Sequence, residues 1–298
     1  DVTLSIAKTA QPAPGETLCY YYHENVYRPS AESHTFKEIS QMGLEMLGAV
    51  GEAQVQQAVR LAAQSLAQLG AAWVLEVSHM GYLFGLFDAL GVPENARPGL
   101  LEKLREKNAH ELRRAAQAAG LDAAGAAALT GLLELSGSCE ETLAKAESAC
   151  RNDRMRAAAA ELRALAKTLE ASGGSVRLDL SLAGEMEYYN GLVFQGYLQG
   201  LPRPLLKGGR YDLLMQKFTP GAGAIGFAVY LDELDRLSAP TPPVQRNSTD
   251  RVMLNVALPK GRLGDRMYDL LARIGYGCTE DYNATRKLVV ENPAAGIR

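Results

Sequence analysis

The chain has 298 residues, 47% of them hydrophobic, which is enough for one large packed domain or two ordinary ones without stabilising disulfides. Its net charge is −3 and its Lys and Arg residues are scattered, so nothing supports a nucleic-acid partner. No apolar run approaches membrane-spanning length, and the N-terminal residues lack a signal-peptide layout. Cys19, Cys139, Cys150 and Cys278 lie far apart without a CxxC pair, which argues against a metal site and indicates a protein of the reducing cytoplasm.

The first residues predict the start of a helix, because Asp1 and Thr3 are good N-capping residues and helix-compatible residues follow them. A strand is expected over residues 17–28, where aromatic and β-branched residues are frequent. Arg28 ends this strand, and a polar loop follows it.

A second expected strand, residues 36–47, places polar side chains on one face. Gln41, Gly43 and Glu45 are two residues apart, so their side chains point to the same side, and the glycine would leave room between the amide and the carboxylate. Such a face can hold a small ligand that carries an ammonium group. The alternative is a solvated strand face, which the pattern alone favours.

Residues 51–69 repeat apolar side chains at helical spacing, and residues 72–77 read as a strand, so a layered domain of helices and strands is expected. His79 follows at a strand-to-helix junction, where a capping or packing role is predicted rather than a catalytic one. Residues 93–173 are alanine-rich with apolar helical faces and predict a helical insertion between the two halves of the sheet.

The stretch 176–234 is expected to floor a pocket. Apolar residues alternate from Val176 to Leu182, which predicts a half-buried strand. The pair Asn190-Gly191 favours a tight hairpin into a second strand over residues 192–198. The glycines of KGGRYD at 207–212 are expected at the mouth of a short helix, and residues 224–230 as a last buried strand.

A proline-rich linker is expected over residues 238–250, and a new unit begins after it. Residues 252–258 read as a strand, followed by a glycine turn and an amphipathic helix. Lys260 and Arg262 at this helix start are candidate contacts for a substrate phosphate, because the backbone N–H groups and the cations would face the same anion. Helix-start cations that face water are the alternative.

Three stretches carry a resemblance: GEMEYYNGLVFQGY, KGGRYD and AIGFAV. They resemble the end of the catalytic domain of histidyl-tRNA synthetases and, still more, the regulatory subunit of ATP phosphoribosyltransferase, a relative that does not aminoacylate. Strand, arginine, loop and strand with Gln and Glu four apart is similar to the second class II signature. The resemblance implies an α+β fold, an antiparallel class II synthetase-like sheet flanked by helices with a helical insertion. It implies these histidine-binding residues: Asp1, Thr3, Arg28, Gln41, Glu45, Tyr189 and Tyr211.

The departures from the synthetase pattern point away from catalysis. Gly184 stands where an RGLDYY-like motif has arginine, and Glu233 stands where the last motif has arginine, so a carboxylate would repel a triphosphate. His34-Thr35-Phe36 stands where Arg-Glu-Phe is expected. The resemblance with these losses implies a non-catalytic histidine sensor. A divergent histidyl-tRNA synthetase and a scaffold with a relic pocket are the alternatives.

Residues 252–298 resemble the beginning of the catalytic subunit of ATP phosphoribosyltransferase, through ALPKGRL and the RKL strand. The expected organisation is a regulatory domain over 1–237, a linker over 238–250, and a truncated start of a catalytic α/β domain over 251–298, in a chain that is a piece of a longer protein. The resemblance implies L-histidine and a catalytic subunit or domain as partners, a homodimer within a larger hetero-oligomer, and no cofactor in the regulatory part. Mg²⁺ would serve the complete phosphoribosyltransferase reaction, the first step of histidine synthesis.

Overall fold

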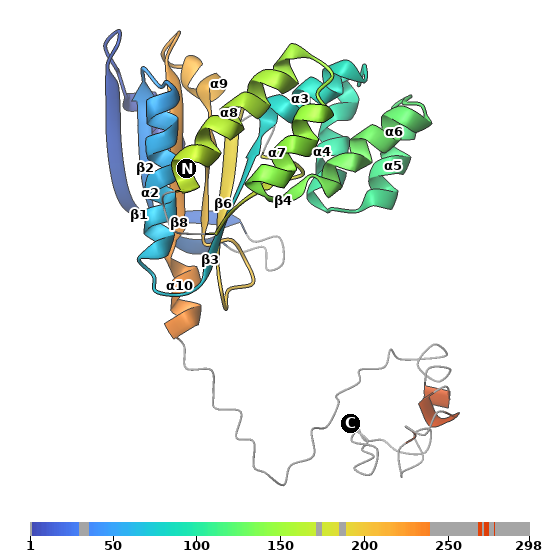
Figure 1. Ribbon diagram of the computed structural model, residues 1–298. Coiled ribbons are helices and arrows are strands. Elements are labelled where there is room, and N and C mark those ends of the chain that lie inside the picture. Colours follow the sequence, from blue (N-terminus) through green and yellow to red (C-terminus); the bar gives the residue numbers. More distant parts are fainter. Residues whose placement is uncertain are drawn as a thin grey trace. The chain divides into compact units, whose positions relative to one another are not determined.

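A computed structural model describes residues 2–29, 36–170, 175–184, 189–238, 268–269, 271–273 and 277 (Figure 1). The chain divides into two compact units, residues 1–239 and 240–298, and each is described by itself. Asp1, the linker residues after 238, Lys260, Arg262 and both strands expected in the second unit lie outside the described residues. The fold below is therefore that of the first unit.

One mixed sheet of eight strands organises this unit, in the order β1-β2-β8-β7-β6-β3-β5-β4. All neighbouring strands are antiparallel except β3 and β5, which are parallel. The α+β sheet expected from the sequence is confirmed. The strands are β1 Thr17–Pro29, β2 Phe36–Gly48, β3 Trp73–His79, β4 Ser136–Ser138, β5 Ser175–Asp179, β6 Leu192–Leu198, β7 Leu206–Arg210 and β8 Gly223–Tyr230.

The expected hairpin at Asn190-Gly191 is wrong. Strands β5 and β6 do not pair with each other, because β3 lies between them and pairs with both. Gly191 has no positive φ; it is needed because a Cβ there would lie 2.9 Å from Cδ of Arg210. The glycines of KGGRYD lie within β7 rather than in a turn, and Gly208 allows the carbonyl of Gly226 to approach closely.

Helices α2 (Glu52–Ala67) and α8 (Asp153–Glu170) cover one face of the sheet (Figure 1). In α2 the residues Val55, Val59, Ala62 and Leu66 are buried, as their helical spacing predicts. His79 begins α3 (Met80–Ala89) as its N-cap, with Nδ1 accepting from the amide of Gly81 at 3.0 Å, so the predicted capping role is confirmed.

The expected insertion over 93–173 is mainly helical. Asn108, Asp122 and Ser138 cap α5, α6 and α7 through their side chains, which explains where these helices begin. The short strand β4, which pairs with β5, was not predicted. The insertion helices are η1 Glu94–Ala96, α4 Arg97–Arg105, α5 Ala109–Ala118, α6 Ala123–Thr130, η2 Gly131–Glu134, α7 Cys139–Ser148 and α8; outside the insertion lie α1 Val2–Thr9, α9 Asp212–Gln216 and α10 Leu231–Ser238.

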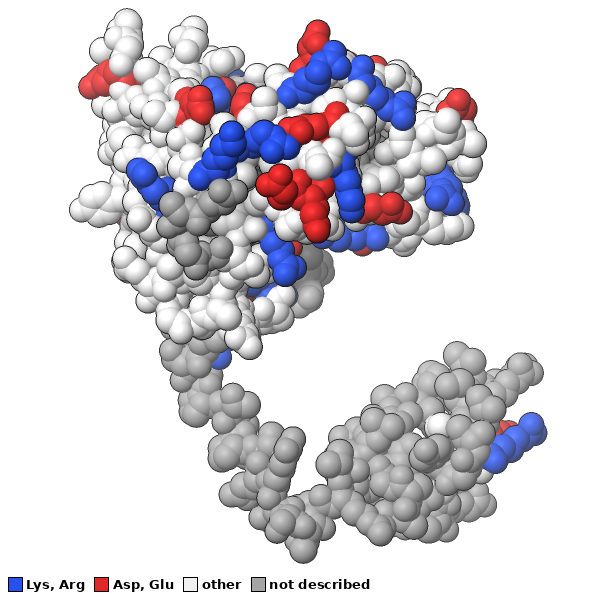
Figure 2. All heavy atoms as spheres, viewed as in Figure 1, with Lys and Arg blue, Asp and Glu red and all other residues white. Residues whose placement is uncertain are grey.

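Charges are mixed on the helical surface seen in Figure 2, where basic and acidic side chains alternate. Three arginines of α8 form ion pairs, Arg163 with Glu147, Arg154 with Asp88 and Arg156 with Asp153. Within the described ranges, no helix has the length and apolar character needed to cross a bilayer. Those residues also include no cluster of three or more His, Cys, Asp or Glu side chains suited to a metal ion.

Candidate functional site

A cavity of about 480 Å³ opens on the sheet face opposite α2. Gln195 and Gly196 are consecutive in β6 and so point to opposite faces: Gln195 lines the cavity, whereas a Cβ on Gly196 would lie 2.6 Å from Leu66 of α2. Strands β1, β2, β6, β7 and β8 contribute to the cavity, together with α1 and the end of α4.

The cavity gathers all the described residues that the sequence predicted for histidine. They come from α1, from the ends and middle of the β1–β2 hairpin and from the 184–211 region, which are far apart in the chain. Of the predicted set, only Asp1 lies outside the described residues. The lining members are Thr3, Arg28, Gln41, Glu45, Tyr189 and Tyr211.

Glu45 is the buried polar centre of the cavity. Its side chain accepts hydrogen bonds from Thr3 Oγ1 at 2.7 Å and from the Tyr211 hydroxyl at 2.5 Å. Glu45 is 2% exposed and Gln41 is 3% exposed, so the solvated strand face considered for this strand is wrong. Instead, the strand presents an amide and a carboxylate to an enclosed space, where each can hold a ligand N–H group.

Burial raises the pKa of Glu45 to about 7, although the hydrogen bonds from Tyr211 and Thr3 each lower it. Burial also raises the pKa of Tyr22, which lines the cavity beside Glu45, so this phenol stays protonated. Near neutral pH the carboxyl of Glu45 is therefore partly protonated, and a ligand with a cationic or N–H group favours the ionised form.

Glycines shape the cavity by allowing close approach. A Cβ on Gly226 would lie 1.7 Å from Oε2 of Glu45, so the carboxylate folds back over the neighbouring strand only because that residue is glycine. The sequence suggested that Gly43 leaves room for a ligand, and this expectation is wrong. The ring of Tyr22, its partner on β1, occupies that space, 2.4 Å from where a Cβ would be.

Tyr189 packs between two glycines, Gly184 on one side and Gly209 on the other. A Cβ on either residue would lie 2.6 Å from the tyrosine ring. Position 184, where arginine was expected in a synthetase, is therefore a place where any side chain would displace Tyr189. The loss of arginine there accompanies a specific packing of the tyrosine.

The carboxylate of Glu233 does not face the cavity. It is 6% exposed on α10 and forms an ion pair with Arg236 at 3.2 Å, and it is not among the described residues that line the cavity. The expectation that Glu233 would repel a triphosphate in the pocket is therefore not supported by its position. What remains relevant at position 233 is that the arginine of the synthetase motif is missing there.

Sequence reasoning missed several lining residues, including Tyr22, Arg105, Gln195 and Lys207. Pairing the two strands by their hydrophobic pattern would have placed Tyr22 opposite Gly43. Gln195 and Lys207 are direct partners on β6 and β7, but the misplaced glycine turn concealed that pairing. Arg105 carries no local signal, because it belongs to the insertion and lies 78 residues before its acceptor Ala183.

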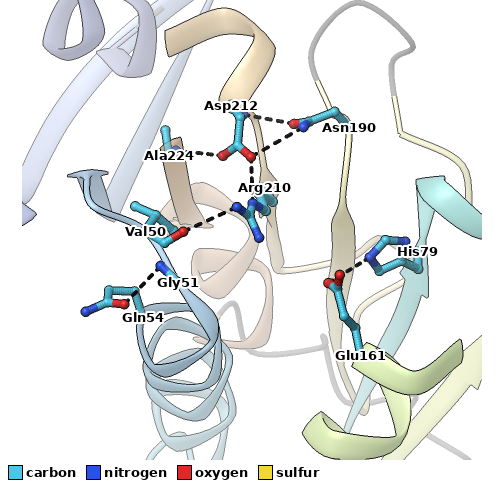
Figure 3. A network of polar contacts seen from close by, with 9 residues as sticks. All are labelled: Val50, Gly51, Gln54, His79, Glu161, Asn190, Arg210, Asp212 and Ala224. Carbon is cyan, nitrogen blue, oxygen red and sulfur yellow. Dashed lines mark hydrogen bonds and ion pairs between the residues drawn. The ribbon is translucent and has the colours of Figure 1, made fainter. Parts of the chain in front are cut away.

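A polar network holds Arg210 and Asp212, the two residues next to Tyr211 in the chain (Figure 3). Asp212 accepts from Nε of Arg210 at 2.7 Å, from the amide of Ala224 at 2.9 Å and from Nδ2 of Asn190 at 3.4 Å. The amide of Asp212 donates back to Oδ1 of Asn190 at 2.9 Å. Arg210 also donates to the carbonyl of Val50. These bonds fix the backbone that carries the Tyr211 hydroxyl to Glu45.

Replacing Asp212 with asparagine should lower the free energy of unfolding by about 2–3 kcal/mol, because an amide has one acceptor oxygen where three donors converge. Urea denaturation measures this difference. Asp153→Asn is the control. It also removes a carboxylate that pairs with an arginine, Arg156, but Asp153 is 98% exposed, so the loss in free energy of unfolding should stay below about 0.5 kcal/mol. Equal costs for the two variants would mean that the Asp212 network does not stabilise the fold.

Replacing Tyr211 with phenylalanine should raise the pKa of Glu45 above about 7, because the hydroxyl donates to the ionised carboxylate and lowers that pKa. The carboxyl resonance of ¹³C-labelled glutamate, followed against pH, measures this change. Tyr27→Phe removes an exposed hydroxyl that donates to Glu38, and it should leave the titration of Glu45 unchanged. A Tyr211→Phe titration identical to wild type would contradict the assigned bond.

Comparisons with known proteins agree with this geometry. The family model described as histidyl-tRNA synthetase matches residues 1–234. An ATP phosphoribosyltransferase regulatory subunit from Desulfitobacterium hafniense is 33% identical over 217 residues, which cover 72% of this chain and 55% of that protein. The matched part thus spans little more than half of that relative.

Two solved structures share the fold. One, described as an ATP phosphoribosyltransferase regulatory subunit/histidyl-tRNA synthetase from Bacillus halodurans, is 27% identical with a TM-score of 0.68 and covers 96% of this chain and 74% of its own. The other is an ATP phosphoribosyl transferase (HisG:HisZ) complex from Thermotoga maritima, with a TM-score of 0.63. At 19% identity over 77% of this chain and 79% of that one, it shows the fold alone.

Proposed function

Because this chain belongs to the histidyl-tRNA synthetase family, we propose that its cavity binds free L-histidine and that the chain is a histidine-sensing regulatory component of ATP phosphoribosyltransferase. In this proposal it does not aminoacylate tRNA. Relatives that are named as regulatory subunits of that enzyme support the assignment. Residues 251–298, outside the described part except for a few positions, are proposed to be the start of a fused catalytic domain.

The observation that carries the proposal is the polarity of the cavity. Its buried end holds Glu45 and Gln41, which can accept hydrogen bonds from an imidazole or an ammonium group. Its exposed rim includes Arg28, Arg105 and Lys207. A zwitterionic amino acid with a basic side chain matches both ends, because its cationic and N–H groups can face the carboxylate while its own carboxylate faces the rim.

Two features argue against amino-acid activation. Gly184 packs against Tyr189 and leaves no room for the arginine of the synthetase motif, and Glu233 stands on α10 in place of another arginine. Without these fixed guanidinium groups the charge that develops at an α-phosphate is less stabilised. The cations of the rim keep a divergent histidyl-tRNA synthetase as the second candidate, since they can attract phosphates.

Calorimetric titration of the purified chain with L-histidine tests the proposal. We expect saturable binding of one L-histidine per chain, weaker binding of L-lysine and L-arginine, and no ATP-dependent pyrophosphate exchange. Exchange of pyrophosphate in the presence of histidine and ATP would establish the synthetase alternative instead. A chain that keeps its fold and binds no histidine would favour a scaffold with a relic pocket.

The proposal includes the partners that the family resemblance implied. A catalytic subunit or domain, for which Mg²⁺ would serve the phosphoribosyl transfer, is expected to contact this chain in the cytoplasm, in an assembly built on a homodimer. Histidine binding and contact with the catalytic part must then influence each other equally, because a coupling free energy is reciprocal. Adding the catalytic subunit should therefore change the histidine affinity of this chain by the same factor by which histidine changes the affinity between them.

A further inference from the structure

Arg105 reaches the rim of the cavity from outside the sheet. It is the last residue of α4 in the helical insertion, and its side chain lines the cavity together with Gly184 and Tyr189. Its Nη2 donates to the carbonyl of Gly184 at 2.7 Å, and its Nε donates to the carbonyl of Ala183 at 3.3 Å. Both acceptors belong to the segment against which Tyr189 packs.

These two bonds hold the guanidinium without neutralising it. A guanidinium has five N–H donors, and the two carbonyls use two of them, so three donors have no hydrogen bond to the residues that the structure describes. Among the described residues, no carboxylate forms an ion pair with Arg105. The guanidinium is therefore a positioned cation with spare donors at the exposed end of the cavity.

The charges of the cavity differ between its two ends. Glu45 is the one carboxylate among its described lining residues, and it lies at the buried end with two donors already bound to it. Three cations, Arg28, Arg105 and Lys207, stand at exposed positions. An anionic group of a ligand is therefore attracted to the rim and repelled from the buried end.

The end of α4 is fixed by a second contact. Lys107 pairs with Asp179 through Nζ and Oδ2 at 2.5 Å, and Asp179, which is 2% exposed, also accepts from the amide and the hydroxyl of Ser181. Lys107 has a φ of 52°, a backbone conformation that is uncommon for residues other than glycine. Arg105 and Lys107 thus hold the insertion to residues 179–184 at two points, which positions the guanidinium.

We propose that Arg105 selects a ligand that carries a carboxylate, and that the helical insertion is in this way part of the ligand site. The inference rests on the proposed function, since it takes L-histidine as the ligand. Arg105 would donate to the α-carboxylate through its spare N–H groups while Glu45 and Gln41 hold the nitrogen end. A planar guanidinium suits this task better than an ammonium, because it offers two parallel N–H donors.

The experiment compares L-histidine with L-histidinol, in which a hydroxymethyl group replaces the carboxylate. Wild-type protein should bind histidine at least about 10-fold more tightly than histidinol, the factor that corresponds to one charged hydrogen bond at an exposed rim. In Arg105→Gln the Kd for histidine should rise about 10-fold, and the Kd for histidinol should change less than about 2-fold. Titration calorimetry measures all four constants.

Two further variants keep the result interpretable. Arg113→Gln removes an exposed arginine from the same insertion and should leave both constants unchanged. In Arg105→Ala, added methylguanidinium should restore part of the histidine affinity and none of the histidinol affinity, an effect that a purely structural arginine would not produce. Thermal melts of each variant show whether the fold is retained.

The outcomes separate the two proposals. An Arg105→Gln variant that weakens both ligands equally, or neither, would overturn the role of Arg105 while histidine binding itself stands. Wild-type protein that binds neither ligand would overturn the proposed function and this inference together. Binding of AMP without histidine that Arg105→Gln abolishes would assign the cations to a phosphate instead, and would also overturn the carboxylate proposal.

Discussion

Replacing Glu45 with glutamine should weaken L-histidine binding by about 100-fold without lowering the stability of the fold. The carboxylate is the ionisable acceptor at the buried end of the cavity, and an amide of the same shape has no charge to offer a cationic ligand. Thr3 donates to Oε1 and Tyr211 to Oε2, so one of these hydroxyls keeps its bond to the amide oxygen and the other turns to accept from the new NH2 group, which keeps the protein contacts of residue 45. Titration calorimetry and urea denaturation measure the two effects separately.

The stability of the wild-type protein should depend on pH in a way that this variant lacks. The pKa of Glu45 is about 7 in the folded protein against 4.5 as the ordinary value, so between these pH values the folded state keeps a proton that the unfolded state has lost. The stabilisation that this retained proton gives the folded state is fully present below pH 4.5. It is lost as the pH rises through 7, which lowers the free energy of unfolding by up to about 3 kcal/mol. Glu45→Gln should remove this slope.

Glu38→Gln is the matched control, because Glu38 lies on the same strand but is exposed, and within the described part of the chain its side chain accepts from Asn25 and Tyr27. It should leave histidine affinity and the slope between pH 4.5 and 7 as they are in wild type. A Glu45→Gln protein that binds histidine normally would show that this carboxylate does not hold the ligand. A Glu45→Gln protein that retains the wild-type slope would show that Glu45 is not the group with the raised pKa.

The parts of the fold that depend on local pattern were predictable. The strands β1 and β2, the helix α2 and the cap at His79 follow from alternation, helical spacing and capping chemistry over a few residues. That Gln41 and Glu45 point to the same side follows from the two-residue period of a strand, but the burial of these two side chains does not. Burial depends on β8, which pairs with β2 although it lies about 180 residues later.

The order of the strands could not be read from neighbouring residues. The pair Asn190-Gly191 satisfies the rule for a hairpin, yet β3 enters between β5 and β6 and takes both partners. Long-range pairing decided the outcome, because β3 offers Val74, Leu75 and Val77 to strands on both of its edges. The glycine in this pair serves close packing against Arg210 instead of a turn.

The same limit applies to the site. Thr3, Glu45 and Tyr211 were each assigned through family motifs, and the structure adds that they are joined by direct hydrogen bonds. Arg105 belongs to no such motif and arrives through the placement of α4 against residues 183–184. A residue whose role depends on how an insertion docks is visible only after the fold is known.

Replacing Gly226 with alanine should both destabilise the protein by about 1–3 kcal/mol and abolish measurable histidine binding. The new Cβ would lie 1.7 Å from Oε2 of Glu45 and 2.5 Å from the carbonyl oxygen of Leu44, so the carboxylate must leave its position between Thr3 and Tyr211. Gly99→Ala is the control: nothing lies within 4 Å of a Cβ there, and alanine favours the helix α4 that contains it.

A double-mutant cycle with Glu45→Ala separates the two clashes of Gly226→Ala. Shortening residue 45 removes the carboxylate but leaves the carbonyl of Leu44 in place, so Gly226→Ala should cost clearly less free energy of unfolding in the Glu45→Ala protein than in wild type. Urea denaturation of the four proteins gives the interaction energy. The same cost in both backgrounds would mean that Gly226 serves the backbone of β2 and β8 alone. A lower cost would show that glycine is required there because the carboxylate of Glu45 folds over it.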